Sequence, residues 1–396
     1  MVLADPGWYD SSWSYRKKIT IDNTKVTANL ADFPVLVYLS SDSDLANDAQ
    51  PDGDDILFTA ADETTQLSHE IENFNNGTGE LVAWVKVPSL SSSSDTIIYM
   101  YYGNAGISSQ QNASGVWDAN YKMVQHLQED TGGANSILDS TANGNHGTDN
   151  STPTLGATGK IDGATFFDGS GELIDIDDSA SLDITDNITL EAWVNPTTVD
   201  TNHRRIVIKS HDTWEAPHYM YSLWVHSTGL GFGFNDGTTR IYSNEGTVST
   251  GSWQYVAATY NGTVQEWYIN GSSVGTQNAT GTIVTNDQPL IIGSALGTTT
   301  RFHGSIDEVR ISNVARSSDW LQTSYNNQNT PSTFFSPLGS EESSPAAPIS
   351  VGAPVFPINK FRVMAPWLGV AFVFLSVVIG GSLFSRRTLG SRSKNR

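Results

Sequence analysis

Residues 165–196 constrain the fold of this chain more than any other stretch. Apolar side chains occupy every second position between Ile188 and Val194, and Ile174 and Ile176 alternate with acidic residues in the same way. Glycine, aspartate and serine separate these runs. A period of two residues bounded by turn formers predicts half-buried antiparallel strands and argues against a helix. We expect the core of this region to contain Phe166, Ile174, Ile176, Leu190 and Val194.

The same kind of pattern fills residues 13–104. Short strand-like runs are separated by turn-forming clusters at 51–55, 75–79 and 89–95, and no run with helical periodicity competes with them. This arrangement predicts a small all-β domain, most simply a sandwich of about seven strands.

Five blocks of this region resemble a known family. WSYRKKITI, DFPVLVYL, DGDDILFTAAD, HEIENF and VAWVKVPSLSSSSDTIIYMYYGN, in that order, are similar to the prokaryotic DUF2341 family. The resemblance covers residues 13–104 and implies an extracellular β-sandwich module. The family has no assigned chemistry, so the resemblance implies no activity.

Residues 116–338 predict a second all-β domain. Asn261-Gly262 and Asn270-Gly271 are signals for type I′ hairpin turns between alternating strands, and Gly-rich turns recur along the region. Such spacing is typical of a sandwich or jelly roll. One helix is predicted over residues 317–328, with Ser317 or Ser318 as its N-cap.

This region also resembles a family. The blocks WDANYKMVQHLQED, DSTANGNHGT, GKIDGATFFDGSGELIDI, ITLEAWVNP, WQYVAATYNGTVQEWYINGSSVG and HGSIDEVRISNVARS are similar to concanavalin A-like, laminin-G-like (LamG-like) jelly rolls. The fold class that we predict is therefore all-β: an N-terminal β-sandwich, a concanavalin A-like jelly-roll sandwich and one C-terminal transmembrane helix.

The C-terminal region differs in composition from the two domains. Residues 339–362 are rich in proline without periodicity, which predicts an extended stalk. Residues 363–385 carry no charge and are long enough for a transmembrane helix, and the basic residues of 386–396 mark a cytoplasmic tail. We expect a cell-surface protein that is anchored in the membrane by this helix, with the rest of the chain outside.

Charge and cysteine content exclude several functions. The net charge of −21 disfavours nucleic acid as a partner, because so acidic a protein repels phosphate backbones. The chain has no cysteine, which excludes disulfides, thiolate metal sites and cysteine nucleophiles.

No catalytic motif stands out in the sequence. The nearest approach to the paired carboxylates of a glycosidase is Glu172, Asp175 and Asp177, but no second glutamate follows in register. We interpret these residues as the solvated face of a strand. The protein is therefore predicted not to be an enzyme.

A structural Ca²⁺ is the cofactor that we predict. Asp139, Asn143 and Asn145 supply oxygen ligands in one turn-rich loop. The LamG-like resemblance implies a further ligand at the acidic start of a late strand, here Asp307. The alternative is that these residues form Asx-turns only.

The most site-like cluster for a ligand is Trp214, His218 and Tyr219, in an apparent loop. Aromatic rings of this kind bind sugars in sandwich lectins, although packing of the rings in the core is an equal alternative. We predict a non-catalytic adhesion protein that recognises glycans or surface polymers through the LamG-like domain. A structural envelope spacer is the first alternative, and a glycoside hydrolase or its accessory carbohydrate-binding module is the second.

Overall fold

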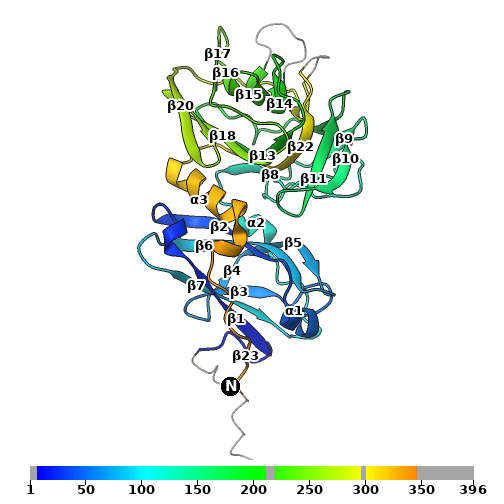
Figure 1. Ribbon diagram of the computed structural model, residues 1–396, viewed down its shortest axis with the longest axis vertical. Helices are drawn as coiled ribbons and strands as arrows, with labels where there is room; N and C mark the ends of the chain where they lie inside the picture. Colours follow the sequence, from blue (N-terminus) through cyan, green and yellow to red (C-terminus); the bar gives the residue numbers. More distant parts are fainter. Residues whose placement is uncertain (1–6, 211–218, 296–299, 346–396) are drawn as a thin grey trace, which may run out of the picture. The chain divides into compact units, whose positions relative to one another are not determined.

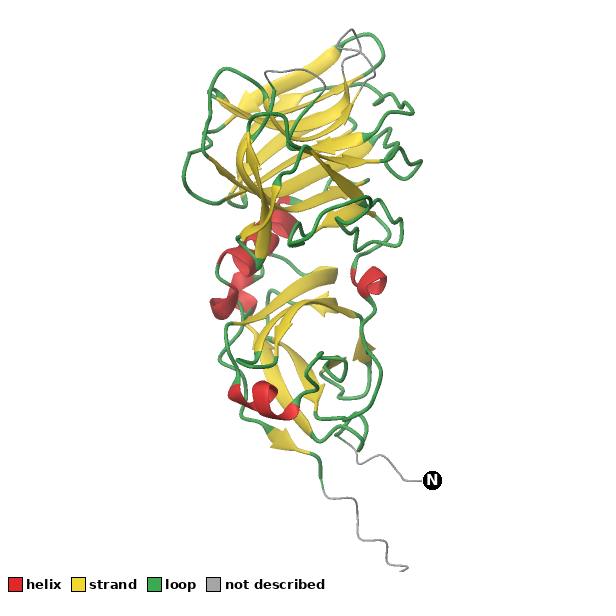
Figure 2. Ribbon diagram, turned by 90° about the vertical axis from the view of Figure 1, so that its right-hand side faces the viewer, coloured by secondary structure: helices red, strands yellow, loops and turns green. Residues whose placement is uncertain are grey.

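The protein is built almost entirely from antiparallel strands. The computed structural model describes residues 7–210, 219–295 and 300–345. Within them, four sheets pair into two sandwiches, and helices are few and short (Figures 1 and 2). The predicted all-β sandwich class is confirmed.

The first sandwich combines a five-stranded sheet, in the order β23-β1-β7-β3-β4, with a three-stranded sheet, in the order β2-β6-β5. The strands are β1 (Tyr15–Ile21), β2 (Leu30–Leu39), β3 (Leu57–Ala60), β4 (Gln66–Leu67), β5 (His69–Asn75), β6 (Glu80–Leu90), β7 (Thr96–Tyr102) and β23 (Glu342–Ser343). The short helices η1 (Asn23–Lys25) and α1 (Ser43–Asp48) connect them. Seven of these strands come from the N-terminal region in which the sequence predicts about seven.

The second sandwich has larger sheets. One sheet follows the order β10-β11-β22-β13-β18-β19-β20, with β8 also paired to β22, and the other follows β17-β16-β15-β14-β21-β12-β9. The first contains β8 (Tyr121–Gln125), β10 (Thr154–Thr158), β11 (Gly163–Asp168), β13 (Asn187–Pro196), β18 (Gln254–Asn261), β19 (Val264–Ile269), β20 (Ser272–Asn278) and β22 (His303–Ser312). The second contains β9 (Gly147–Asn150), β12 (Leu173–Ile176), β14 (Arg204–Ser210), β15 (Tyr219–His226), β16 (Gly229–Asn235), β17 (Arg240–Glu245) and β21 (Leu290–Ile292).

The core of the second sandwich lies between these two sheets, and it corrects one expectation. Ile174, Ile176, Leu190 and Val194 are buried there as predicted. Phe166 is not a core residue: it is only half-buried and contacts His303, while its neighbour Phe167 is fully buried. Successive residues of a strand point to opposite faces, so only one of two adjacent phenylalanines can enter the core.

The predicted hairpin turns differ from one another. Asn270 and Gly271 both have positive φ angles, 51° and 76°, as a type I′ turn requires. Of the other pair, only Gly262 has a positive φ, 87°, because Asn261 ends β18 and accepts hydrogen bonds from the backbone N–H groups of Thr263 and Val264. The turn at Asn261-Gly262 is therefore an Asx-type turn with Gly262 at its first central position.

The predicted helix forms as α3 (Ser318–Asn329), and Ser317 is its N-cap, accepting a hydrogen bond from the N–H of Trp320. Two further short helices are α2 (Ala113–Val116) and η2 (Pro331–Thr333).

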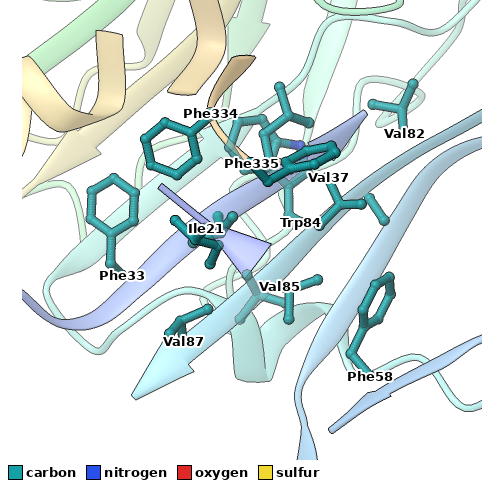
Figure 3. Packing of buried hydrophobic residues seen from close by; sticks show 14 of the residues in the cluster. Ile21, Phe33, Val37, Phe58, Val82, Trp84, Val85, Val87, Phe334 and Phe335 are labelled. Atoms are coloured by element: carbon teal, nitrogen blue, oxygen red, sulfur yellow. The ribbon is translucent and has the colours of Figure 1, made fainter. Parts of the chain in front are cut away.

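After α3 the chain returns to the first sandwich. Phe334 and Phe335 lie in the cluster of buried residues that contains Ile21 and Phe33 (Figure 3). Further on, β23 pairs with β1, and Tyr102 donates a hydrogen bond to Glu341. The stalk was expected from residue 339, but residues 339–344 belong to the first sandwich because this pairing satisfies their backbone.

The remaining C-terminal predictions concern the stalk, the membrane helix and the cytoplasmic tail. The rest of the stalk, the apolar stretch 363–385 and the basic tail lie outside the described residues. Among the helices that are described, none combines the length and the hydrophobicity needed to cross a membrane.

Candidate functional site

The seven-stranded sheet of the second sandwich has one face toward the core and a second, outer face. Along β14, β15, β16 and β17 the paired residues Arg205, Trp224, Gly231 and Asn244 form one row across the sheet. Trp224 and Tyr219 pack with Ile208 and Ile291 in a small cluster that is separate from the main core. Side chains of this row therefore lie on the outer face.

Glycine in β16 lets an indole ring lie flat on this face. A Cβ atom at Gly231 would come within 2.0 Å of Trp224 Nε1, so any other residue there would collide with the ring. The indole N–H of Trp224 donates a hydrogen bond of 2.9 Å to Asn244 Oδ1 on the far side of the glycine. Gly233 likewise leaves room for Tyr242, because a Cβ atom at Gly233 would lie 2.4 Å from the Cβ of Tyr242.

Further aromatic rings surround Trp224. The ring centroid of His203 is 5.3 Å from that of Trp224 and 5.1 Å from that of His226, and Tyr242 is 6.1 Å from Trp224. Tyr242 is 44% exposed, one of the few large apolar side chains of the described residues that faces solvent. We refer to the set as the aromatic face: His203, Tyr219, Trp224, His226 and Tyr242.

Arg205 lies at the base of the aromatic face. Its guanidinium carbon is 4.6 Å from the ring centroid of Trp224 and 5.1 Å from that of Tyr219. The side chain is only 2% exposed, and Nη1 donates a hydrogen bond of 3.0 Å to Ser222 Oγ. Its Nε is buried without a hydrogen-bond partner, and in residues 7–210, 219–295 and 300–345 no carboxylate pairs with it.

Electrostatics at this face favour negative charge. Burial lowers the pKa of Arg205 to about 10, and the charge of Arg240 acts in the same direction. Burial also lowers the pKa of His203 to about 4, helped by Arg205, His226 and Arg240. His203 is therefore a neutral ring at neutral pH, next to a permanent positive charge.

One of the three ligand-binding residues predicted from sequence, Tyr219, lies on this face. Tyr219 opens β15 and is buried in the aromatic face, in contact with Trp224. Trp214 and His218 lie outside the described residues, in the segment that joins β14 to β15. The sequence thus identified one member of the face and missed the other four.

The loop predicted to bind calcium is present and well packed. Asp139 accepts hydrogen bonds from the backbone N–H groups of Val124, Thr141 and Asn145, and from the Thr141 hydroxyl. The side-chain amide of Asn143 donates to the carbonyl of Tyr121. These bonds are those of the Asx-turn alternative, and they engage both carboxylate oxygens of Asp139.

The fourth predicted calcium ligand has different partners. Asp307 Oδ2 accepts hydrogen bonds from the backbone N–H groups of Lys160 and Ile161, none of which is shared with Asp139. Asn143 and Asn145 instead line a pocket of about 280 Å³ together with Asp177 and Asp178. Calcium binding stays a prediction. Asp307 shares no described hydrogen-bond partner with Asp139, Asn143 or Asn145.

The carboxylates weighed as catalytic have local partners. Glu172 is buried and accepts a hydrogen bond from the backbone N–H of Asp168 in its own turn. Burial raises the pKa of Asp175, with a smaller contribution from exposed Asp177. Nothing in this arrangement resembles an acid paired with a nucleophile across a substrate.

A second polar cluster was not anticipated. Among the described residues, Glu72, His126 and Glu308 form the one group of metal-ligand side chains whose donor atoms all lie within 4.8 Å of one another. His126 Nδ1 is 2.6 Å from Glu308 Oε1, and Arg310 binds the other oxygen of Glu308. Because Glu308 is already paired with both His126 and Arg310, we assign the cluster to the joining of the two sandwiches.

Sequence signals for these sites were weak. Repeated Gly-x-Gly in 229–233 indicated a strand but not that an indole would cover it. Arg205 and Trp224 become neighbours only through the pairing of β14 with β15, and His126 and Glu308 are 182 residues apart.

Two family models match the chain. Residues 167–322 match the concanavalin A-like lectin/glucanases superfamily, and residues 52–133 match a domain of unknown function, DUF2341. Both resemblances seen in the sequence are thereby confirmed. Among curated proteins, none matches this chain.

Solved structures show a distant likeness. The binding domain of Paraclostridial Mosquitocidal Protein 1 has 14% identity and a TM-score of 0.44, covering 52% of each chain. Domain 4 of AbnA, a GH43 extracellular arabinanase from Geobacillus stearothermophilus solved with arabinotriose, has 18% identity and a TM-score of 0.42, covering 52% of this chain and 98% of that one. The Botulinum neurotoxin serotype D ligand-binding domain with N-acetylneuraminic acid has 14% identity and a TM-score of 0.43, covering 55% of this chain and 53% of that one. The match thus spans about half the length of the first and third chains.

Proposed function

We propose that this protein is a non-catalytic glycan-binding protein of the cell surface, and that the aromatic face of the second sandwich is its binding site. The single observation that carries the proposal is the packing of His203, edge-on, and of the 44% exposed Tyr242, at a tilt, around Trp224 on the outer face of a sheet. Sugar rings have apolar C–H surfaces that pack on flat aromatic rings, and polar groups at the edge fix their orientation. Asn244 and Arg205 supply such polar groups.

The charges at the face support binding without hydrolysis. Cleavage of a glycosidic bond requires two carboxyl groups that flank the bond. The charged groups that act on His203 are Arg205, His226 and Arg240, all of them cationic when charged. Such a set is suited to holding a ligand and supplies no acid and nucleophile pair.

Attachment to the cell surface is part of the same proposal. The uncharged stretch 363–385, followed by a basic tail, supports anchoring in the membrane with both sandwiches outside. In that arrangement the chain would act in adhesion. A structural Ca²⁺ bound by the loop of Asp139, Asn143 and Asn145 remains part of the proposal.

A structural spacer is the second candidate. One observation favours it: the buried cluster of the first sandwich continues into the second through Trp117, Trp193 and Tyr255, so that the two share apolar packing. Shared packing of this kind is suited to a stiff element.

The test is a glycan array on the full-length chain, with and without EDTA. The variant Tyr242→Ala should lose at least about tenfold of the retained signal while its melting temperature stays within about 1 °C, because an exposed side chain contributes little to stability. Leu138→Ala is the matched control, since Leu138 is 56% exposed on the same sandwich and is not a member of the aromatic face. Trp214→Ala tests the sequence prediction.

The array separates the two candidates. A glycan signal that Tyr242→Ala removes and Leu138→Ala preserves supports binding at the aromatic face. Absence of signal from every glycan, in calcium and in EDTA, rejects glycan binding and favours the spacer.

A further inference from the structure

Arg205 is a buried cation without a counter-ion among the described residues. The side chain is 2% exposed, and within the described part of the chain Arg205 has no ion pair like that of Arg204 with Asp200. Burying a charge is costly unless it is paired and hydrogen-bonded. Two aromatic rings and one serine hydroxyl compensate only part of that cost.

We propose that the aromatic face binds glycans that carry a carboxylate, those with a uronic acid or a sialic acid residue, and that Arg205 binds this carboxylate. The inference rests on the proposed function and specifies the ligand class of the same site. It makes Arg205 the determinant of specificity and the aromatic rings the platform for the sugar.

The guanidinium is held in a fixed orientation. The hydroxyl of Ser222 donates its proton to the carbonyl of Val207, at 2.9 Å, and therefore accepts from Arg205 Nη1 with a lone pair. The rings of Tyr219 and Trp224 restrict the guanidinium further. Binding then requires little ordering of the arginine, which favours affinity.

The part of the guanidinium that remains suits a carboxylate. Nη1 is engaged by Ser222, whereas Nε is buried and has no hydrogen-bond partner. Nε and Nη2 lie along one edge of the planar group, where a carboxylate accepts two parallel hydrogen bonds. The ligand supplies the missing counter-ion in one step.

Charge favours a single acidic group over a highly charged polymer. Arg240 adds positive potential at the face, but the whole chain has a net charge of −21. So acidic a protein repels densely sulfated chains and nucleic acids, while one carboxylate at a local positive site is attracted. His203 and Tyr242, which are not fully buried, are the rings available to the rest of the sugar.

The ligand-side test needs no variant. Binding of the full-length chain is measured by calorimetry to trigalacturonate and its methyl ester, and to sialyllactose and lactose. The free acid of at least one pair should bind about tenfold to a hundredfold more tightly than its neutral partner, as expected for a bidentate ionic hydrogen bond. The two pairs distinguish uronic from sialic acid as the source of the carboxylate.

The protein-side test uses stability as an independent readout. Arg205→Met should abolish the preference for the acid while leaving the melting temperature unchanged or higher, because it removes an unpaired buried charge. Arg205→Lys keeps the charge but loses the planar fork and should lose most of the preference. Arg204→Gln is the control: it removes the same charge from the adjacent residue, which already pairs with Asp200.

Each outcome decides between the two proposals. Equal binding of acid and ester, and of sialyllactose and lactose, overturns the carboxylate inference but leaves glycan binding intact. Sulfated lactose is measured as a further ligand. If it binds as tightly as sialyllactose, the carboxylate inference is also overturned. Absence of binding to any sugar rejects the proposed function itself. A clear loss of stability in Arg205→Met, with unchanged preference for the acid, would show that Arg205 is structural only.

Discussion

His126, directly after β8, and Glu308, on β22, are joined by a 2.6 Å hydrogen bond between the imidazole Nδ1 and a carboxylate oxygen. The same imidazole lies 3.5 Å from Glu70 and 3.5 Å from Glu72, both on β5 of the first sandwich. Burial alone would lower the pKa of His126, but the three carboxylates raise it well above its usual value. A histidinium buried among carboxylates thus links the two sandwiches.

Glu72→Gln should change how stability depends on pH. Burial raises the pKa of Glu72 to about 8, with Glu308 and Asp162 acting in the same direction and His126 opposing them. The folded protein therefore holds a proton that the unfolded chain releases near pH 4.5. The stability from this group is complete below that pH and is lost as the pH rises toward 8. His126 acts in the same direction, because its folded pKa is also raised.

We expect the wild-type free energy of unfolding to fall by about 2–4 kcal/mol between pH 5.5 and 8.5. Glutamine keeps an oxygen for the indole N–H of Trp84, which donates to Glu72 at 2.8 Å, but it does not titrate. The share of this fall that comes from Glu72 should be absent from the variant, whereas the share that comes from His126 should remain. Urea unfolding at both pH values measures the difference, and equal slopes in the two proteins would refute this explanation.

Phe166 and Phe167 should respond differently to truncation. Phe167→Ala removes a fully buried ring from the core between the sheets and should lower the free energy of unfolding by about 3–5 kcal/mol. Phe166→Ala removes a half-buried ring on the other face and should lower it by no more than about 1 kcal/mol. Denaturant unfolding of both variants checks this, and similar losses would contradict the assignment of faces.

Gly231→Ala should disrupt the aromatic face. Its Cβ would lie 2.0 Å from Trp224 Nε1, so the indole must leave its place beside Asn244. Overpacking of this kind costs about 1–3 kcal/mol, and glycan retention should fall together with the near-ultraviolet circular dichroism signal. Gly77→Ala is the control, because its nearest neighbour is a side-chain oxygen at 3.3 Å. A variant with unchanged spectrum and retention would show that the ring is not held as described.

Phe334→Ala tests the return of the chain to the first sandwich. The ring is fully buried in the cluster with Ile21 and Phe33, so its loss should lower the free energy of unfolding by about 3–5 kcal/mol. Ser332→Ala, at an exposed position of η2, should have almost no effect. If both variants unfolded at the same denaturant concentration as wild type, residues 331–344 would not be an integral part of the first sandwich.

Much of the fold follows from local patterns. The alternation between Ile188 and Val194 predicts the buried strand β13, and the serine cap with one apolar face predicts α3. Phe166 shows the limit of such patterns. A shift of one residue exchanges the two faces of a strand, and with Phe166 and Phe167 adjacent, either ring could be the one that enters the core. Asn261 shows the same for turns, because an Asn-Gly pair permits more than one hairpin geometry.

The candidate site was harder to predict than the fold. Tyr219 was identified as an aromatic residue in an apparent loop, but no sequence pattern singled out Arg205. Its significance depends on having Trp224 and Tyr219 as neighbours and no carboxylate partner among the described residues, which is a property of sheet order. The cluster of Glu72, His126 and Glu308 likewise draws on three strands or strand ends from both sandwiches.

The sequence by itself determined that this chain folds into strands and which side chains of each strand share a face, because the two-residue period is a local property of the backbone. Only the tertiary structure decided which strands are neighbours. Sheet order placed Arg205 beside Trp224, with no carboxylate partner among the described residues, and tertiary packing returned Phe334 to the first sandwich. Charge pairing and burial act between residues that are distant in sequence, so they are fixed only when the sheets assemble.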